Sequence, residues 1–156
     1  YDPKNGAIRL TDEVYASTSV GAIGVAAHEA GHAVQYAQHY FPIRIRAALI
    51  PITTIGSNLA IPLAIIGLFM GLYWLVDVGI ILFLAVVLFQ LVTLPVEYNA
   101  SGRALRTLES ENFLTAEELS GAKKVLSAAA LTYVAALVVA VANLLRLLLL
   151  RNRNRD

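Results

Sequence analysis

Residues 59–96 read LAIPLAIIGLFMGLYWLVDVGIILFLAVVLFQLVTLPV and contain a single charged side chain, Asp77. A transmembrane helix needs about 20 mostly apolar residues to cross about 30 Å of hydrocarbon. Leu59–Val76 and Val78–Val96 each come close to that length without a charge. Because Asp77-Val78-Gly79 offers turn-forming residues between them, we predict a transmembrane helical hairpin that turns at Asp77.

The composition of the whole chain supports insertion into a membrane. Of its 156 residues, 58% are hydrophobic and 15% are charged, whereas soluble domains are about 45–50% apolar and about 25% charged. Val125–Leu145 is a further uncharged stretch, continued by Arg146 and the run Leu147–Leu150. A soluble chain of this size has too little polar material to cover such helices. The sequence therefore predicts an all-α membrane protein.

Charge and cysteine content exclude other classes of protein. Lys and Arg number 12 against 11 Asp and Glu, which leaves a net charge of +1 and argues against a nucleic-acid partner. The chain contains no cysteine, so disulfides, thiolate catalysis and Cys-ligated zinc are excluded.

Most of the charge lies in two polar segments, Tyr1–Arg46 and Glu97–Lys124, which also hold all three histidines. In the second, Thr115 and Glu118 have the spacing of a capping box at a helix start. The Arg-Asn tail Arg151–Arg155 is predicted to be a solvated or headgroup-facing end. We expect one domain over residues 1–156, with a helix over about 19–40, the hairpin over about 58–96, a helix over about 96–110 and a C-terminal helix over about 116–150.

The residues with catalytic potential lie in the segment 25–34, VAAHEAGHAV, which contains the pattern H-E-x-x-H. His28, His32 and Gln35 form a polar stripe, and residues four apart lie on one helix face, so the two imidazoles can bind one ion. Zinc takes such nitrogen ligands at about 2.0–2.1 Å in tetrahedral geometry. Glu29 is then placed to take a proton from a zinc-activated water. His39 lies beyond this set, and we predict an interfacial or capping role for it.

A catalytic zinc site needs a third protein ligand, and no histidine follows His39, so a carboxylate must serve. Glu97 is our first choice because it is the first charge after the hairpin, which returns the chain to the level of His28 and His32. The alternatives lie in the polar stretch that follows: Glu109, Glu111, Glu117 and Glu118. A Glu ligand would make a two-His, one-Glu site for one Zn²⁺.

Three segments resemble the neutral zinc metallopeptidases of bacterial membranes, the YugP-type proteins. These segments are residues 24–35, GVAAHEAGHAVQ, residues 94–101, LPVEYNAS, and residues 121–133, GAKKVLSAAALTY. Tyr1-Asp2-Pro3 and Arg9-Leu10 also resemble the part of that family ahead of the zinc helix. The resemblance covers essentially the whole chain, and its motifs are specific when taken together, although H-E-x-x-H alone is generic.

The resemblance implies a membrane-embedded zinc peptidase of the bacterial inner membrane, related in layout to HtpX-type and prenyl-protein proteases. It implies that His28, His32 and Glu97 are the ligands and that Glu29 is the catalytic base. HtpX-type proteins place an Asp four residues after the ligand Glu, where this chain has Ser101. We therefore expect Ser101, Asn99 or a backbone carbonyl to support a ligand histidine. Family members also begin with an upstream membrane segment, so a chain that starts at Tyr1 suggests a truncated or processed form.

The predicted function is zinc-dependent endopeptidase activity on a peptide or membrane-protein substrate within the lipid bilayer. Tyr133, Tyr98 and Asn99 are candidates for the second oxyanion donor. Tyr133 is preferred because small residues around it would let its helix approach the zinc helix closely. A zinc-binding scaffold or sensor without proteolysis is the alternative. A transport module is disfavoured because the hairpin lacks paired intramembrane charges.

Basic residues flank the predicted membrane segments on the side of the H-E-x-x-H helix, which favours a cytoplasmic active site by the positive-inside rule. These residues are Arg44, Arg46, Arg103, Arg106, Lys123 and Lys124. If the last helix crosses fully, the tail Arg151–Arg155 lies on the opposite side. If that helix lies partly within the protein, the tail does not cross.

Overall fold

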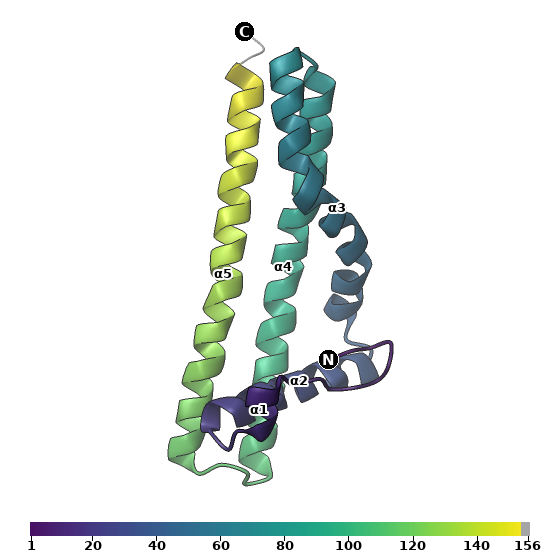
Figure 1. Ribbon diagram of the computed structural model, residues 1–156. Coiled ribbons are helices and arrows are strands. Elements are labelled where there is room, and N and C mark those ends of the chain that lie inside the picture. The colour runs from purple at the N-terminus through teal and green to yellow at the C-terminus, as the bar shows by residue number, and fades with distance from the viewer. Residues whose placement is uncertain (154–156) are drawn as a thin grey trace. The chain divides into compact units, whose positions relative to one another are not determined.

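The computed structural model describes residues 1–153, and within this range it has helices and no strand (Figure 1). The all-α fold class is thus confirmed. Arg155, at the end of the predicted tail, lies outside the described residues. The helices are α1 (Asp12–Ala16), α2 (Val20–Ala37), α3 (Phe41–Met70), α4 (Tyr73–Ser110) and α5 (Ala116–Arg153).

The chain divides into two compact units, which we call the first and the second unit. The first unit comprises Tyr1–Arg44 and Leu94–Thr132, and the second comprises Ile45–Thr93 and Tyr133–Asp156. The boundary between them falls inside α3, α4 and α5, so each of these helices contributes residues to both units. The first unit contains the H-E-x-x-H helix.

Three helices, α3, α4 and α5, are long and apolar enough to cross a membrane. In the second unit they share an apolar core made of Ala60, Ala64, Val76, Phe83, Val87, Ala140 and Leu147. Many large apolar side chains of this unit point outward, including Phe69, which is 89% exposed, and Leu149, which is 70% exposed. An outer surface of this kind suits hydrocarbon rather than water.

The hairpin turns at Gly71, so the predicted turn at Asp77 is wrong. Gly71 adopts a φ of 69°, the left-handed conformation that glycine tolerates best. The amide of Gly71 bonds to the carbonyl of Leu68, and the amide of Leu72 bonds to that of Gly67, which is the Schellman pattern of a helix end. Helix α4 begins at Tyr73, so Asp77 lies in its second turn.

Asp77 instead forms an ion pair with Arg151 within the second unit. Arg151 Nε lies 2.6 Å from Asp77 Oδ1, and its Nη2 lies 3.0 Å from Oδ2. Such a two-bond pair has better geometry than a single contact. The one charge of the hairpin is thereby compensated. Arg151, which we assigned to a solvated or headgroup-facing tail, is engaged with α4.

Helix α4 also replaces two of the predicted helices by one. We expected the hairpin to end near residue 96 and a separate helix to follow, but α4 continues through Pro95 to Ser110. Proline removes one backbone hydrogen bond and usually bends or ends a helix. Here the helix continues, and Glu97 lies two residues after the proline on the same helix.

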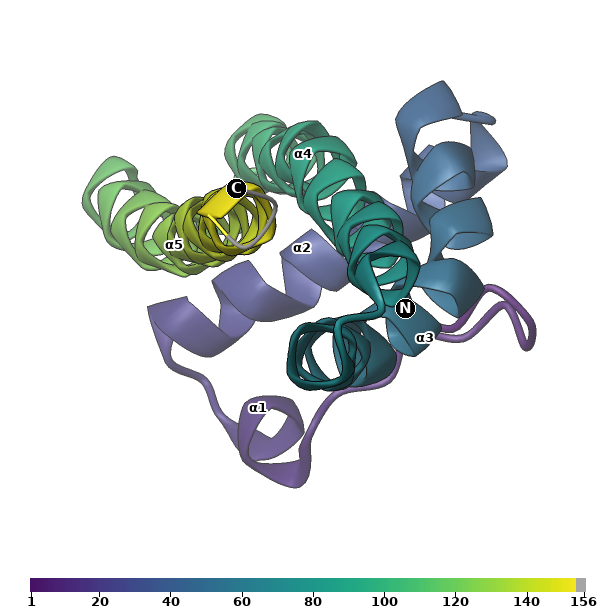
Figure 2. The ribbon, with the colours of Figure 1, turned by 90° about the horizontal axis from the view of Figure 1, so that it is seen from above.

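In the first unit, α2 lies across the C-terminal part of α4 and the N-terminal part of α5 (Figure 2). Ser19 caps the start of α2 by accepting a hydrogen bond from the amide of Ala22. The capping box at the start of α5 is confirmed: the Thr115 amide donates to Glu118, and the Glu118 amide donates to the Thr115 hydroxyl. These caps satisfy amides that a helix start leaves without intrahelical partners.

The N-terminal turn of the first unit is organised around Asp2. The side chain of Asn5 donates to Asp2 at 2.7 Å, and the amides of Lys4 and Asn5 also point at this carboxylate. The Asn5 side chain is the main cause that lowers the pKa of Asp2, with further help from Arg9. The turn places the ring of Tyr1 5.5 Å from that of Tyr36 on α2.

The contact between α3 and α4 at Gly79 yields a stability prediction. A Cβ atom at Gly79 would lie 2.6 Å from the carbonyl oxygen of Ala60, which is too close for either backbone to remain in place. We expect Gly79→Ala to cost about 1–3 kcal/mol of stability. This corresponds to a lower thermal unfolding midpoint in detergent by about 2–10 °C.

The matched control for this variant is Gly102→Ala, because a Cβ there meets no atom within 4 Å. Alanine is the better helix former, so the control should leave the midpoint unchanged or raise it. Equal midpoints for the two variants would show that the close approach at Gly79 is absent in the protein.

Candidate metal centre

The H-E-x-x-H histidines of α2 and one glutamate of α4 come together in the first unit. One ligand atom from each of His28, His32 and Glu97 lies within 4.8 Å of the others. Glu97 Oε2 is 3.1 Å from His28 Nε2 and 3.6 Å from His32 Nε2. The imidazole centroids are 4.7 Å apart with the rings nearly perpendicular, so both rings direct an edge at the same carboxylate.

The dimensions of this group suit a zinc ion. Tetrahedral bonds of about 2.0–2.1 Å place neighbouring ligand atoms about 3.3–3.4 Å apart, and the distances of 3.1 and 3.6 Å lie on either side of that value. Glu97 is only 2% exposed, and a buried carboxylate requires compensating positive charge. Two imidazole nitrogens and a carboxylate oxygen are also a donor set that zinc accepts.

The four alternative carboxylates do not belong to this group. Glu109 and Glu111 lie at the end of α4 and in the following loop, and Glu117 lies in the first turn of α5, all three exposed. Glu118 is held by the capping box. His39 is also outside the group: it adopts a φ of 52° in the turn after α2, where its amide bonds to the Tyr36 carbonyl.

Ser101 and Gln35 contact the ring nitrogens that face away from Glu97. Ser101, one of the residues that we named as a support for a ligand histidine, has its Oγ 2.9 Å from His28 Nδ1. Gln35 Oε1 lies 2.9 Å from His32 Nδ1. Bonds of this kind fix the orientation of a metal-binding imidazole.

Gln35 is the residue of the site whose role we did not predict from the sequence. The sequence feature that could have indicated this role is the position of Gln35 in the polar stripe, three residues after His32 on the same helix face. Asn99, which we named as a support for a histidine, lies one step behind Gln35 rather than against an imidazole ring. Its Oδ1 instead accepts hydrogen bonds from Gln35 and Arg103.

Glu29, the predicted base, neighbours His28 on α2 and is partly exposed. Its carboxylate accepts a hydrogen bond from the α-amino group of Tyr1, and its side chain keeps 26% of its surface exposed. Of the predicted oxyanion donors, Tyr98 is 52% exposed on α4. Tyr133 belongs to the second unit, and its role stays a prediction.

A glycine allows α2 and α4 to approach closely enough for the group to form. A Cβ atom at Gly31 would lie 2.5 Å from the carbonyl oxygen of Ala100. Ala100 and Ala104, which face α2, are fully or almost fully buried. Because Gly31 immediately precedes His32, this contact sets how far the second histidine lies from Glu97.

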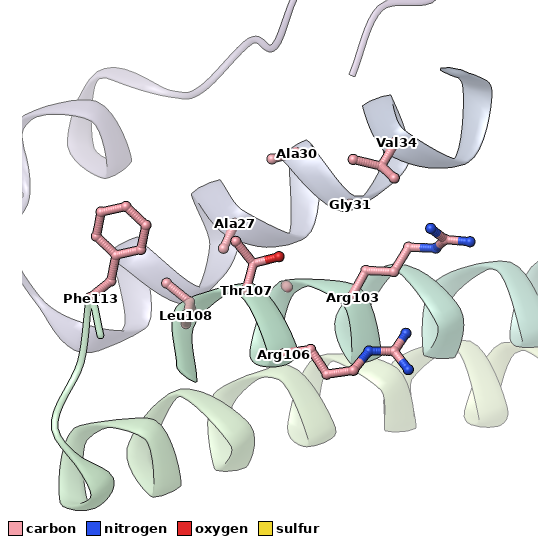
Figure 3. Close-up of a pocket in the computed structure, with 10 residues that line it drawn as sticks. Ala27, Ala30, Gly31, Val34, Arg103, Arg106, Thr107, Leu108 and Phe113 are labelled. Atoms are coloured by element: carbon pink, nitrogen blue, oxygen red, sulfur yellow. The ribbon is translucent and has the colours of Figure 1, made fainter. Parts of the chain in front are cut away.

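A cavity of about 420 Å³ lies on another flank of α2 (Figure 3). It is lined by Ala27, Ala30 and Val34 of α2, by Arg103 and Arg106 of α4, and by Phe113, among others. None of His28, Glu29, His32 and Glu97 lines it. The cavity and the candidate metal centre are therefore separate features of the first unit.

Comparison with known proteins gives the class to which this chain belongs. Residues 1–152 match the family described as "Putative neutral zinc metallopeptidase". The chain belongs to this family of zinc metallopeptidases. It is also 46% identical, over all of its 156 residues and 69% of the relative, to "Putative membrane protease YugP" of Bacillus subtilis (strain 168). No solved structure matches the chain.

The contact at Gly31 predicts how metal binding depends on helix spacing. In Gly31→Ala the new methyl group must push α2 away from the Ala100 carbonyl, which separates His32 from Glu97. We expect the zinc affinity of the purified protein to fall about 10–100-fold, as for other disturbances of ligand geometry. Competition with a chromophoric chelator measures this affinity.

Gly24→Ala is the matched control on the same helix. A Cβ at Gly24 would lie 3.5 Å from the Cβ of Ala122, which is an ordinary packing distance. Its zinc affinity should equal that of the unaltered protein. Unchanged affinity in Gly31→Ala would contradict a metal centre between these two helices.

Proposed function

We propose that this protein is a zinc-dependent endopeptidase in which His28, His32 and Glu97 hold one Zn²⁺ and Glu29 is the general base. The observation that carries this proposal is the buried Glu97 carboxylate, 3.1 and 3.6 Å from the Nε2 atoms of the two histidines. Membership of a zinc metallopeptidase family and similarity to a protein named as a membrane protease support it.

The three ligands have distinct parts in holding the ion. Each neutral imidazole offers an Nε2 lone pair, while Nδ1 is engaged by Ser101 or Gln35. Glu97 supplies the one negative charge of the donor set. Bound zinc would supply a Lewis acid that polarises the scissile carbonyl and lowers the pKa of water to about 7.

Glu29 moves the proton in the proposed reaction. It follows His28 directly, so its carboxylate projects about 100° further round α2 than the ligand. With 26% of its side chain exposed, it can be reached by water and by a peptide. Glu29 accepts the proton of the attacking water and then delivers it to the nitrogen of the leaving amine.

Tyr133 stays our candidate for the second donor to the oxyanion on the sequence pattern alone. Ser101 is a poorer choice because its hydroxyl contacts His28 Nδ1. Asn99 has its side-chain oxygen held by Gln35 and Arg103, and this fixes the orientation of its amide group. Both residues support the ligands rather than the substrate.

The substrate is a peptide or a membrane-protein segment presented at the bilayer. The helices α3, α4 and α5 are apolar enough to cross a membrane. Glu97 lies in the C-terminal part of α4, and the two histidines and Glu29 lie on α2. We place the protein in the bacterial inner membrane with its active site towards the cytoplasm. The basic residues near the site favour this orientation by the positive-inside rule.

Replacing Glu29 separates proteolysis from zinc binding. We expect Glu29→Gln to bind one zinc per chain and to cleave fluorescent casein about 10²–10⁴-fold more slowly, because the amide cannot accept the proton of water. Glu97→Gln should instead lose the metal, since it removes the only charged ligand. Metal analysis and cleavage rates are measured on the same samples.

Glu13→Gln, at an exposed position on α1, is the matched control and should retain both properties. Full cleavage activity in Glu29→Gln with zinc still bound would contradict the proposed mechanism. If the unaltered protein bound zinc but cleaved nothing, the scaffold or sensor reading would replace the peptidase.

The proposed orientation can be tested by labelling cysteines, because the 156 residues contain none. Glu111→Cys lies in the loop after α4 and should react with a membrane-impermeant maleimide only when the reagent reaches the cytoplasmic face. Met70→Cys, 66% exposed at the end of α3, should react only from the opposite face. The reverse pattern would place the active site outside the cytoplasm.

A further inference from the structure

A chain of hydrogen bonds runs from Arg103 to His32 on the side of the imidazole away from Glu97. Arg103 Nε donates to Asn99 Oδ1 at 2.7 Å, and Gln35 Nε2 donates to the same oxygen at 3.0 Å. Gln35 Oε1 lies 2.9 Å from His32 Nδ1. Gln35 has no exposed surface, so its side chain is shielded from water.

The direction of every bond in this chain follows from its first member. Arginine can only donate, so the Asn99 atom that faces it must be the carbonyl oxygen. That oxygen can only accept, so Gln35 presents its amide nitrogen to it, and the second amide hydrogen goes to the carbonyl of Val96 at 2.8 Å. The Gln35 oxygen therefore faces His32 and accepts the hydrogen on Nδ1.

His28 lacks a directed chain of this kind. Its Nδ1 lies against the hydroxyl of Ser101, which can donate or accept with equal ease. Its tautomer is therefore not set by that contact. The two histidines of the motif differ in this respect, although both place Nε2 near Glu97, at 3.1 Å for His28 and 3.6 Å for His32.

We propose that Gln35 is a positioning residue that holds His32 in its Nδ1–H tautomer and so keeps the Nε2 lone pair free for the metal. The role in metal binding rests on the proposed function. Without the Gln35 oxygen, the Glu97 carboxylate would be the acceptor nearest the ring, and it would draw the hydrogen to Nε2. That is the atom on which the metal must bind.

The anchoring of Gln35 also couples the two helices that carry the ligands. Its amide bonds to the carbonyl of Val96, the residue immediately before Glu97. The far end of the chain is fixed as well, because Arg103 Nη1 bonds to Gln38 Oε1 at 2.6 Å and its guanidinium lies 5.9 Å from the centre of the Tyr40 ring. The same glutamine thus orients His32 on α2 and ties it to α4.

The test measures the tautomer directly in metal-free protein. Two-dimensional ¹H–¹⁵N spectra of detergent-solubilised protein labelled at histidine, at a pH about two units above the usual imidazole pKa, distinguish the two tautomers. We expect the Nδ1–H form for His32 in the unaltered protein and a shift to the Nε2–H form in Gln35→Met. Zinc affinity should fall about 10–100-fold in that variant.

Gln35→Met keeps the length and packing volume of the side chain but loses the bond to the Val96 carbonyl. A role limited to tying α2 to α4 therefore predicts no change in the tautomer, which makes the tautomer the deciding readout. An Nδ1–H tautomer and unaltered zinc affinity in a folded Gln35→Met would overturn the proposal. Ser101→Ala is the comparison on the other histidine and should leave the His32 signals unchanged.

Two variants of Asn99 keep the proposal testable if Gln35→Met does not fold. Asn99→Asp retains an acceptor oxygen for both Arg103 and Gln35, so the His32 tautomer should persist. Asn99→Leu removes that acceptor and leaves only the Val96 carbonyl to direct the Gln35 amide, so a share of the Nε2–H form should appear beside the Nδ1–H form. The same tautomer in both variants would overturn the proposal.

The tautomer readout needs neither zinc nor a substrate, so it separates this inference from the proposed function. If the His32 tautomer responds to Gln35 but no zinc binds, the hydrogen-bond chain exists and the peptidase assignment fails. If zinc binds and peptides are cleaved while the His32 tautomer is unchanged in Gln35→Met, the peptidase assignment stands and the inference fails.

Discussion

The buried carboxylate of Glu97 between two imidazoles is the interaction on which the rest of the first unit depends. A carboxylate with 2% of its surface exposed cannot be stabilised by water, so its compensation must come from the groups around it. His28 and His32 can reach it only because α2 and α4 nearly touch at Gly31 and Ala100. The close packing of α2 against α4 is therefore a requirement for bringing the two histidines to Glu97.

That constraint extends to the polar groups behind the histidines. An imidazole that turns one nitrogen to Glu97 must find a partner for the other, since an unpaired buried polar group costs about 1–3 kcal/mol. Ser101 and Gln35 supply these partners, and Asn99 with Arg103 satisfies Gln35 in turn. In the second unit many large apolar side chains lie at the surface, and the charge of Asp77 in the hairpin is paired with Arg151.

The features of the candidate metal centre that follow from local spacing could be predicted from the sequence. H-E-x-x-H fixes which histidines share a face, and the order of apolar and polar segments makes Glu97 the first carboxylate after the hairpin. The position of the hairpin turn could not be predicted from charge. Asp77 forms an ion pair with Arg151, 74 positions later in the chain, and does not mark a turn. The turn lies instead at Gly71, where the backbone takes a positive φ. The bond from Gln35 to Val96 likewise joins residues 61 positions apart, and no local pattern reports such a contact.

A serine rather than an aspartate at position 101 affects the charge of the candidate site as well as its hydrogen bonding. An aspartate behind a ligand histidine would add a second negative charge and make that ligand more basic. Ser101 and Gln35 are both neutral, so the donor set carries only the charge of Glu97. A divalent ion held by these residues would keep a net charge of +1, and a less neutralised ion polarises water and a carbonyl more strongly. A serine at this position is therefore compatible with hydrolysis, provided that neutral groups orient both rings.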